Sequence, residues 1–169
     1  MVKEILLKNK LFILLGLVFI VSRLFFPLYE VDGASMDYTL QDGQRVIGTN
    51  QFEVNRFDIV IIDVPELNKY YVKRVIGLPG DKIAYKNDCL YINDKFVPES
   101  YLNDKKEEWS LLTRDFLIEK IPEGEYFVLG DNRRNSIDSR QLGTIKEANI
   151  LSELLAIYWP LNQMTVLSH

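Results

Sequence analysis

The 169-residue sequence contains one cysteine and one histidine, and these two shortages exclude several kinds of chemistry. With Cys89 alone, the chain has no internal disulfide and no cysteine-rich metal site. The histidine, His169, is the last residue, and a chain end does not hold an imidazole in hydrogen-bond register. Serine–histidine and cysteine–histidine pairs are therefore excluded, and any nucleophile here needs a different base. Nothing in the sequence indicates a metal or an organic cofactor.

Positive charge is scarce outside the amino-terminal segment. Residues 1–28 carry four cations and one anion, a net charge of +3, so the total of −4 leaves −7 for residues 29–169. Nucleic-acid binding generally requires a basic face, and an acidic domain argues against that function. Hydrophobic residues make up 47% of the chain, which is enough for a packed domain.

The longest apolar run covers residues 11–28 and contains one charged residue, Arg23. A membrane-spanning helix needs about 20 mostly apolar residues, and an arginine near the membrane surface is tolerated because its side chain reaches the headgroups. We therefore expect a cytoplasmic segment at 1–10, a single transmembrane anchor at 11–28 in the cell membrane, and an extracytoplasmic domain at 29–169, since the cations precede the anchor. A cleavable signal peptide has a similar apolar length, but its cleavage site would fall at 33–35, inside a motif described below.

After the apolar run, the sequence has the pattern of an all-β domain. Short runs rich in β-branched and aromatic residues alternate with turn signals such as Asn87-Asp88 and Asn93-Asp94. The centre of 150–159 suits a helix and its end suits a strand. Residues 98–120 are the most polar part and predict a surface excursion. The predicted strands are 28–31, 45–49, 59–62, 70–76, 82–85, 89–92 and 125–129.

Two stretches combine residues suited to catalysis. Residues 32–40 hold Ser35 among turn-forming residues, and an ordinary turn explains it as well as a nucleophile does. In the predicted strand 70–76, successive side chains point to opposite faces, so Lys73 or Arg74 must lie against a packed apolar surface. One interpretation is an edge-strand gatekeeper with a snorkelling neighbour. The other is a desolvated lysine, whose lowered pKa would supply a neutral amine as a base for the serine.

A third stretch, residues 130–140, is polar almost throughout. One interpretation is a loop closed by its own Asp, Asn and Ser hydrogen bonds and by a pair between Asp138 and Arg140. The functional interpretation is that this loop orients a lysine amine and makes the site rigid.

Taken together, these stretches resemble the three signature segments of bacterial type I signal peptidases, in the same order and with matching spacing. The resemblance rests on Ser35-Met36 with Thr39-Leu40, on 71–81 (Tyr-Val-Lys-Arg-Val-Ile-Gly-Leu-Pro-Gly-Asp) and on 130–140. It extends to Tyr158-Trp159-Pro160, and the single anchor and short domain are similar to the compact form of Gram-positive bacteria. It implies a mainly β fold, a signal-peptidase-like barrel or sandwich behind one amino-terminal transmembrane helix, with a strand at 150–159.

The resemblance also implies a role for each matching position. Ser35 is the expected nucleophile, its backbone N–H an expected oxyanion donor, and Lys73 the expected general base. The supporting residues that it implies are Ser136, Asp138, Arg140 and Gly130. Ser136 is expected to hold the lysine amine, and Asp138 and Arg140 to form an ion pair. A side chain at Gly130 would crowd the lysine. The residues expected to line shallow pockets for small side chains before the cut are Val31, Met36, Leu40, Tyr71 and Val72.

Three positions depart from the family pattern. Gly33 stands where some relatives carry a second oxyanion hydroxyl, and Arg134 stands where an acidic residue is frequent. Tyr38 replaces the usual proline, which loosens the turn after the nucleophile because proline's fixed φ is lost.

The expected activity is that of a serine endopeptidase that removes signal peptides from exported precursors after Ala-x-Ala through an acyl-enzyme. The expected partners are these signal peptides and the lipid bilayer, with no nucleic acid and no cofactor, and a contact with the secretion machinery is left open. One alternative is a catalytically silent, membrane-tethered relative that binds exported proteins; the presence of Ser35, Lys73 and Ser136 argues against it. Another is a self-cleaving regulator, which would carry a DNA-binding domain in place of the apolar run.

Overall fold

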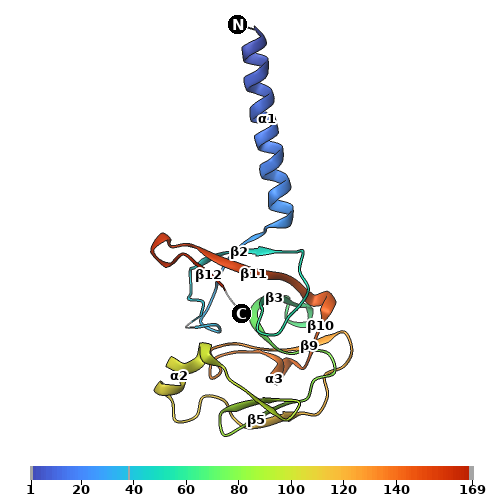
Figure 1. The fold of residues 1–169 in the computed structure, drawn as a ribbon, viewed down its shortest axis with the longest axis vertical. Helices are drawn as coiled ribbons and strands as arrows, with labels where there is room; N and C mark the ends of the chain where they lie inside the picture. Colours follow the sequence, from blue (N-terminus) through green and yellow to red (C-terminus); the bar gives the residue numbers. More distant parts are fainter. Residues whose placement is uncertain (1, 38, 168–169) are drawn as a thin grey trace.

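The structure, a computed structural model, describes the backbone of residues 2–37 and 39–167, and the side chains of this part except those of 2–9 and 11. A helix, α1 (Val2–Phe25), projects from a body of β-strands (Figure 1). It ends just before Pro27, which has no backbone N–H and disfavours helical angles at the preceding residue. The expected loosening of the turn at Tyr38, and the terminal His169, lie outside the described residues.

The large apolar side chains of α1 that the structure describes are exposed. From Phe12 to Phe25 they are 39–71% exposed. Within the described part of the chain, no helix is both long enough and apolar enough to cross a membrane. The structure therefore does not show the transmembrane anchor expected at 11–28, and the helix itself ends at Phe25, three residues before the expected end.

Two antiparallel sheets make up the body, which confirms the mainly β prediction. The larger sheet has the strand order β1-β2-β11-β3-β4-β9-β10, and β12 pairs with β11. Its strands are β1 (Leu28–Glu30), β2 (Arg45–Thr49), β3 (Ile59–Val64), β4 (Lys69–Gly77), β9 (Glu125–Leu129), β10 (Ile145–Lys146), β11 (Ile150–Trp159) and β12 (Thr165–Val166). The smaller sheet has the order β7-β6-β5-β8. Its strands are β5 (Ile83–Lys86), β6 (Cys89–Ile92), β7 (Lys95–Val97) and β8 (Phe116–Ile118).

All seven predicted strands are present, with ends that differ by at most two residues. The ambiguous stretch 150–159 is the strand β11, as the family resemblance implied. The two-residue turns of the β5–β6 and β6–β7 hairpins are the predicted Asn87-Asp88 and Asn93-Asp94, and all four residues have positive φ, as type I′ turns require. Four strands of two or three residues, β7, β8, β10 and β12, were not predicted, because such short segments have no readable period.

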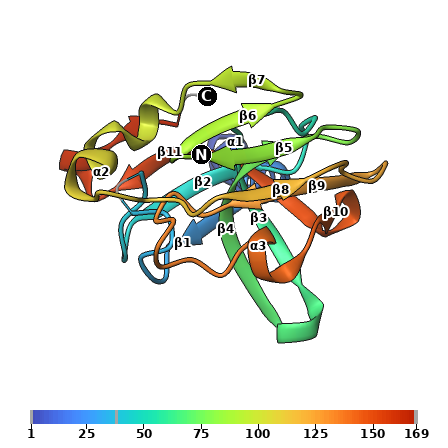
Figure 2. The same ribbon diagram turned by 90° about the horizontal axis from the view of Figure 1, so that it is seen from below.

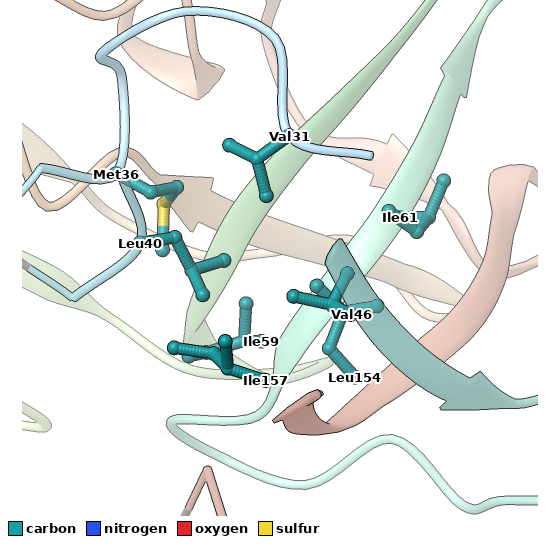
Figure 3. Packing of buried hydrophobic residues seen from close by; sticks show 8 residues of the cluster. All are labelled: Val31, Met36, Leu40, Val46, Ile59, Ile61, Leu154 and Ile157. Atoms are coloured by element: carbon teal, nitrogen blue, oxygen red, sulfur yellow. The ribbon is translucent and has the colours of Figure 1, made fainter. Parts of the chain in front are cut away.

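Three buried apolar clusters hold the sheets together. In the first, residues of the loop after β1 pack onto β3, β2 and β11 (Figure 3). Val31, Met36 and Leu40 supply the loop side of this cluster, and each is at most 4% exposed. A second cluster lies between β3, β4 and β9 on the other face, and a third joins the smaller sheet to β4 and β9. Figure 2 shows the smaller sheet in the order β7, β6, β5, β8, with β9 next to it. The first cluster matters most for the site, because it anchors the loop that carries Ser35.

Residues 98–120 are more deeply integrated than the predicted surface excursion. This stretch contains the 3-10 turn η2 (Ser100–Leu102), the helix α2 (Asn103–Glu108) and β8. The predicted surface position holds for residues 107–111, which are exposed. Glu99, Leu102, Leu112 and Thr113 are buried, because the stretch packs against the smaller sheet and the loop after β9.

Candidate active site

Both cations of β4 are buried. Its neighbours are β3 and β9, so β4 is an interior strand. Lys73 is 0% exposed and Arg74 is 2% exposed, although alternation places them on opposite faces. An edge-strand gatekeeper is therefore excluded, and the desolvated-lysine interpretation applies.

The Lys73 amine lies beside the Ser35 hydroxyl. Nζ is 2.9 Å from Ser35 Oγ and donates to the Val72 carbonyl oxygen at 2.8 Å. Burial lowers the pKa of the Lys73 amine from 10.5 to about 8, and the carboxylates of Asp138 and Asp131 limit this fall. With that pKa, roughly a quarter of the amine is neutral at pH 7.5, against about 0.1% for an exposed lysine. A neutral amine at this distance can accept the hydroxyl proton, which is the geometry of a general base.

Segments on both sides hold the backbone around the nucleophile. Gly33 has φ of +92°, which glycine adopts freely, and its N–H donates to Asp42 Oδ1 at 2.7 Å. From the other side, the Asn132 N–H donates to the Ser35 carbonyl at 3.0 Å, and Asn132 Nδ2 donates to the Ala34 carbonyl at 2.9 Å. The polar loop after β9 therefore clamps the serine peptide directly. Asn132 was not among the predicted site residues, since a polar loop residue carries no sign of its distant partner.

The predicted ion pair in the polar loop is present. Arg140 Nε and Nη2 donate to the two carboxylate oxygens of Asp138 at 2.8 and 2.7 Å. The Asp138 side chain is fully buried and also accepts the Gly130 N–H at 3.0 Å. It caps the short helix α3 (Ser139–Leu142) as well. This carboxylate therefore ties the start of the loop to its end.

Gly130 is required for close approach, although not to the group expected. A Cβ at this position would lie 2.2 Å from Ser136 Oγ and 2.5 Å from the Ser35 carbonyl oxygen. The prediction was that a side chain here would crowd Lys73, yet the three atoms nearest to that Cβ belong to the two serines. Glycine lets the end of β9 approach the nucleophile loop.

Ser136 lines the same hollow as Ser35 and Lys73, but the expected hydrogen bond to the lysine amine is not formed. Its Oγ is buried and has no hydrogen-bond partner in the described part of the chain. The amine instead uses Ser35 Oγ and the Val72 carbonyl as partners. Ser136 therefore has a free hydroxyl beside the reacting groups.

A cavity of about 210 Å³ adjoins Ser35 on one side. Four of the five predicted pocket residues line it, namely Val31, Met36, Tyr71 and Val72. Leu40 does not; it lies in the first apolar cluster, fully buried, because the turn after Ser35 directs it inward (Figure 3). The lining residues that were not predicted are Tyr29, Glu30, Asp32, Ile61, Tyr70 and Leu151.

A hollow of about 480 Å³ adjoins Ser35 on the other side, and we call it the catalytic pocket. It is lined by residues 32–35, Tyr71, Lys73 and residues 134–137. Asp32, Ser35 and Tyr71 line both spaces, so the nucleophile lies between the cavity and the catalytic pocket.

A buried ion pair that the sequence did not reveal braces the back of the site. Arg74 Nη2 and Nε donate to Asp131 at 2.7 and 3.0 Å, and the Thr39 hydroxyl donates to the same carboxylate at 2.5 Å. This network joins the nucleophile loop, β4 and the loop after β9. It gives Arg74 a structural function distinct from that of the adjacent lysine.

A second buried network joins the loop after β9 to the smaller sheet. Arg133 Nη2 donates to Glu99 at 2.6 Å, Nε donates to the Gly130 carbonyl at 3.1 Å, and Nη1 contacts the Tyr85 hydroxyl. Burial alone would raise the pKa of the Glu99 carboxyl, but the Arg133 charge and the hydrogen bonds from Tyr85 and Arg133 bring that pKa below its usual value. The pair is therefore ionised at neutral pH.

A serine hydroxyl beside a buried, partly neutral lysine is the arrangement of a Ser/Lys hydrolase. In the part of the chain that the structure describes, no group of three His, Cys, Asp or Glu residues is placed to hold a metal. The site thus defines a class of enzyme before any relative is considered.

Similarity to known proteins identifies the family of this chain. Residues 4–159 match the family described as "Signal peptidase, peptidase S26". The chain is 44% identical to signal peptidase I of Bacillus licheniformis, with 93% of each chain covered, and 40% identical to signal peptidase I U of Bacillus subtilis (strain 168), with 88% of this chain and 84% of that one covered. The crystal structure of a signal peptidase I from Enterococcus faecalis V583 superposes with a TM-score of 0.59 at 39% identity, covering 61% of this chain and 97% of that one. The chain belongs to the signal peptidase family, peptidase S26, and is of the type I, Gram-positive kind.

Proposed function

We propose that this member of the family removes signal peptides with Ser35 as nucleophile and Lys73 as general base. The observation that carries the assignment is the fully buried Lys73 amine, 2.9 Å from Ser35 Oγ, with a pKa lowered to about 8. Membership of the type I signal peptidase family makes the chain a serine endopeptidase whose substrates are exported precursors.

The reaction proceeds by two acyl transfers. Neutral Lys73 takes the Ser35 hydroxyl proton while Oγ bonds to the scissile carbonyl carbon, and the Ser35 N–H donates to the oxyanion. The Lys73 ammonium then protonates the leaving amine as the C–N bond breaks, which leaves an ester on Ser35. A water molecule, deprotonated by the same lysine, attacks this ester, and the proton returns to Ser35 Oγ when the signal peptide leaves.

The 210 Å³ cavity is the proposed site for the small side chains before the cut. Met36, Val72 and Val31 give it an apolar lining, and Met36 and Val31 are held by the first apolar cluster. Because these residues are packed from behind, a large side chain would require displacement of core atoms, which costs about 1–3 kcal/mol. This supports a preference for Ala-x-Ala before the cut.

Attachment to the cell membrane is part of the proposal. The support is the apolar run at 11–28 with one charge, and the exposed apolar side chains from Phe12 to Phe25. The excess of cations in residues 1–28 favours a cytoplasmic amino terminus, with residues 29–169 on the outer face. Confinement to the bilayer that holds the signal peptide would raise the effective concentration of substrate. Contact with the secretion machinery belongs to the same proposal.

The test of the dyad is cleavage of a purified pre-protein that carries Ala-x-Ala, with product masses locating the cut. Ser35→Ala and Lys73→Ala should each reduce kcat/KM by roughly a thousandfold or more. Ser110→Ala, at an exposed serine, is the matched control and should retain activity. Cleavage by Ser35→Ala at the wild-type rate would refute the assignment, and absence of cleavage by the wild type would favour a silent relative. For the membrane proposal, right-side-out vesicles that carry the full chain should lose residues 29–169 to added protease; full protection would contradict the orientation.

A further inference from the structure

A basic hollow of about 570 Å³ lies next to the catalytic pocket. The residues that line it come from the segment before β8, from β8 and β9, from the loop after β9 and from α3. Because residues 29–169 have a net charge of −7, a concentration of cations at one place is not what composition alone predicts. The charged residues that line it are Arg114, Arg133, Arg134, Arg140 and Asp115.

Two of the four arginines are already neutralised. Arg133 is paired with Glu99 at 2.6 Å, and Arg140 is paired with Asp138 at 2.7 Å. Both carboxylates are fully buried, so these cations are engaged in holding the loop after β9. They contribute little free positive charge to the hollow.

The other two arginines supply charge for a ligand. Arg114 and Arg134 are exposed, and no carboxylate of the described residues forms an ion pair with either. Asp115 is the one anion of the lining; it accepts the Asn87 N–H at 2.9 Å, and its charge offsets part of the charge of these two arginines. The hollow therefore presents two guanidinium groups suited to a carboxylate.

Arg134 also connects this hollow to the reacting groups. It lines both the basic hollow and the catalytic pocket that contains Ser35 and Lys73. Its guanidinium lies over the Trp109 ring at 4.2 Å, and Nη1 donates to the Leu111 carbonyl at 3.0 Å. These contacts hold the side chain in one place, so an incoming anion meets an ordered cation.

The polarity of the bound chain follows from the two spaces beside Ser35. If the residues before the cut occupy the 210 Å³ cavity, the residues after it leave through the catalytic pocket towards Arg134. Arg134 is two positions from Ser136, which lines the same pocket as the nucleophile. Because Arg134 lines the same pocket as Ser35, and an extended chain advances about 3.3 Å per residue, the side chains that meet the guanidinium belong to the first few residues after the cut.

We propose that the basic hollow binds an acidic side chain of the mature segment of the precursor, with Arg134 as the specificity-determining residue and Arg114 as a second cation. This inference rests on the proposed function and adds a subsite after the cut. An anionic lipid is a poorer occupant, because β5 and α3 lie in the part of the body away from α1 (Figure 1).

The experiment uses the full chain in detergent and matched peptide substrates with one Ala-x-Ala site. Each substrate carries Glu or Gln at one of the first five positions after the cut. For wild type, kcat/KM should be about three- to tenfold higher with Glu at one or two of these positions. In Arg134→Gln the Glu/Gln ratio should fall to about one, and Arg114→Gln should lower it in part. Lys95→Gln, at an exposed lysine outside the hollow, is the charge-matched control and should keep the wild-type ratio.

Reversing the charge at residue 134 distinguishes a contact with substrate from a role of Arg134 in folding. Arg134→Glu should prefer Lys over Glu at the same substrate position, which a purely structural role of Arg134 would not produce. A wild-type ratio near one at all five positions, or a ratio that survives Arg134→Gln, would overturn the inference while cleavage itself upholds the proposed function. Absence of cleavage of every substrate would overturn the proposed function and the inference with it. Binding to phosphatidylglycerol vesicles that depends on Arg134, without any Glu/Gln preference, would assign the hollow to lipid instead.

Discussion

Replacement of Lys73 by methionine should abolish cleavage and stabilise the fold at neutral pH. The reason is that the folded state holds a lysine whose ammonium form is disfavoured by burial. The pKa falls from 10.5 in an exposed lysine to about 8 here. At 1.36 kcal/mol per unit, this difference corresponds to about 3 kcal/mol of stability that is missing wherever the lysine is protonated in both states.

Methionine recovers only part of this amount. It fills a similar volume, but it leaves Ser35 Oγ and the Val72 carbonyl without the amine as partner, at about 1 kcal/mol for each. The net expectation at pH 7 is a gain of about 1–2 kcal/mol, or a rise in Tm of roughly 2–8 °C for a chain of this size. The measurement is denaturant unfolding of Lys73→Met and wild type in the same detergent.

The pH dependence identifies the cause. Between pH 8 and 10.5 the unfolded lysine binds more protons than the folded one, so wild-type stability rises through that window relative to Lys73→Met. The advantage of the variant should therefore shrink from pH 8 upwards and reverse by pH 10.5. Lys95→Met, at an exposed lysine, should show neither the gain nor the trend. A Lys73→Met advantage that is constant from pH 7 to pH 10.5, or absent at pH 7, would refute the reasoning.

Three further predictions concern the site and its supports. The kcat/KM of wild type should rise from pH 6 to pH 9 with an apparent pKa near 8, because only the neutral amine of Lys73 is a base. A flat wild-type profile would argue against this base. Lys73→Arg should be inactive at every pH, since guanidinium stays protonated. Gly130→Ala should reduce kcat/KM at least about tenfold and destabilise by about 1–3 kcal/mol, because its Cβ would lie 2.2 Å from Ser136 Oγ; wild-type kinetics would show that the loop shifts freely. Arg133→Met should cost up to about 3–5 kcal/mol, because the buried Glu99 carboxylate keeps only Lys106, 3.5 Å away, as a counter-charge; the double variant with Glu99→Leu should recover part of that loss in thermal unfolding, whereas additive losses would contradict a coupled pair.

Local signals in the sequence predicted most of the fold. Strands such as 45–49 and 89–92 were predicted with their observed ends, because turn residues of known backbone geometry bound them. Two-residue strands such as β10 exist through pairing with a distant partner, in this case β9, and have no local signal. The stretch 98–120 looked like surface for the same reason: its polar residues Glu99 and Thr113 are satisfied by groups far along the chain.

In the candidate site, too, the features with a local signal were predicted and those that depend on contacts between distant residues were not. The alternation within β4 predicted that a cation would be buried, and the scarcity of histidine predicted that a lysine would be the base. Sequence reasoning placed the Asp138–Arg140 pair because its partners are two residues apart. It did not find the pairs of Arg74 with Asp131 or Arg133 with Glu99, whose partners are 57 and 34 residues apart. The direction of the Leu40 side chain depends on the path of the loop in three dimensions, so the sequence did not reveal that Leu40 lies in the first apolar cluster.

The Arg133 network has a consequence for efforts to shorten the protein. The guanidinium that contacts Tyr85 of the smaller sheet and Glu99 just after it also donates to the carbonyl of Gly130, the residue that touches the nucleophile loop. The smaller sheet thus supports the position of the reacting groups, although none of its strands contributes a residue to the catalytic pocket. A minimal enzyme cannot be obtained by excising residues 81–120, because this removes both Glu99 and Tyr85, the partners of Arg133.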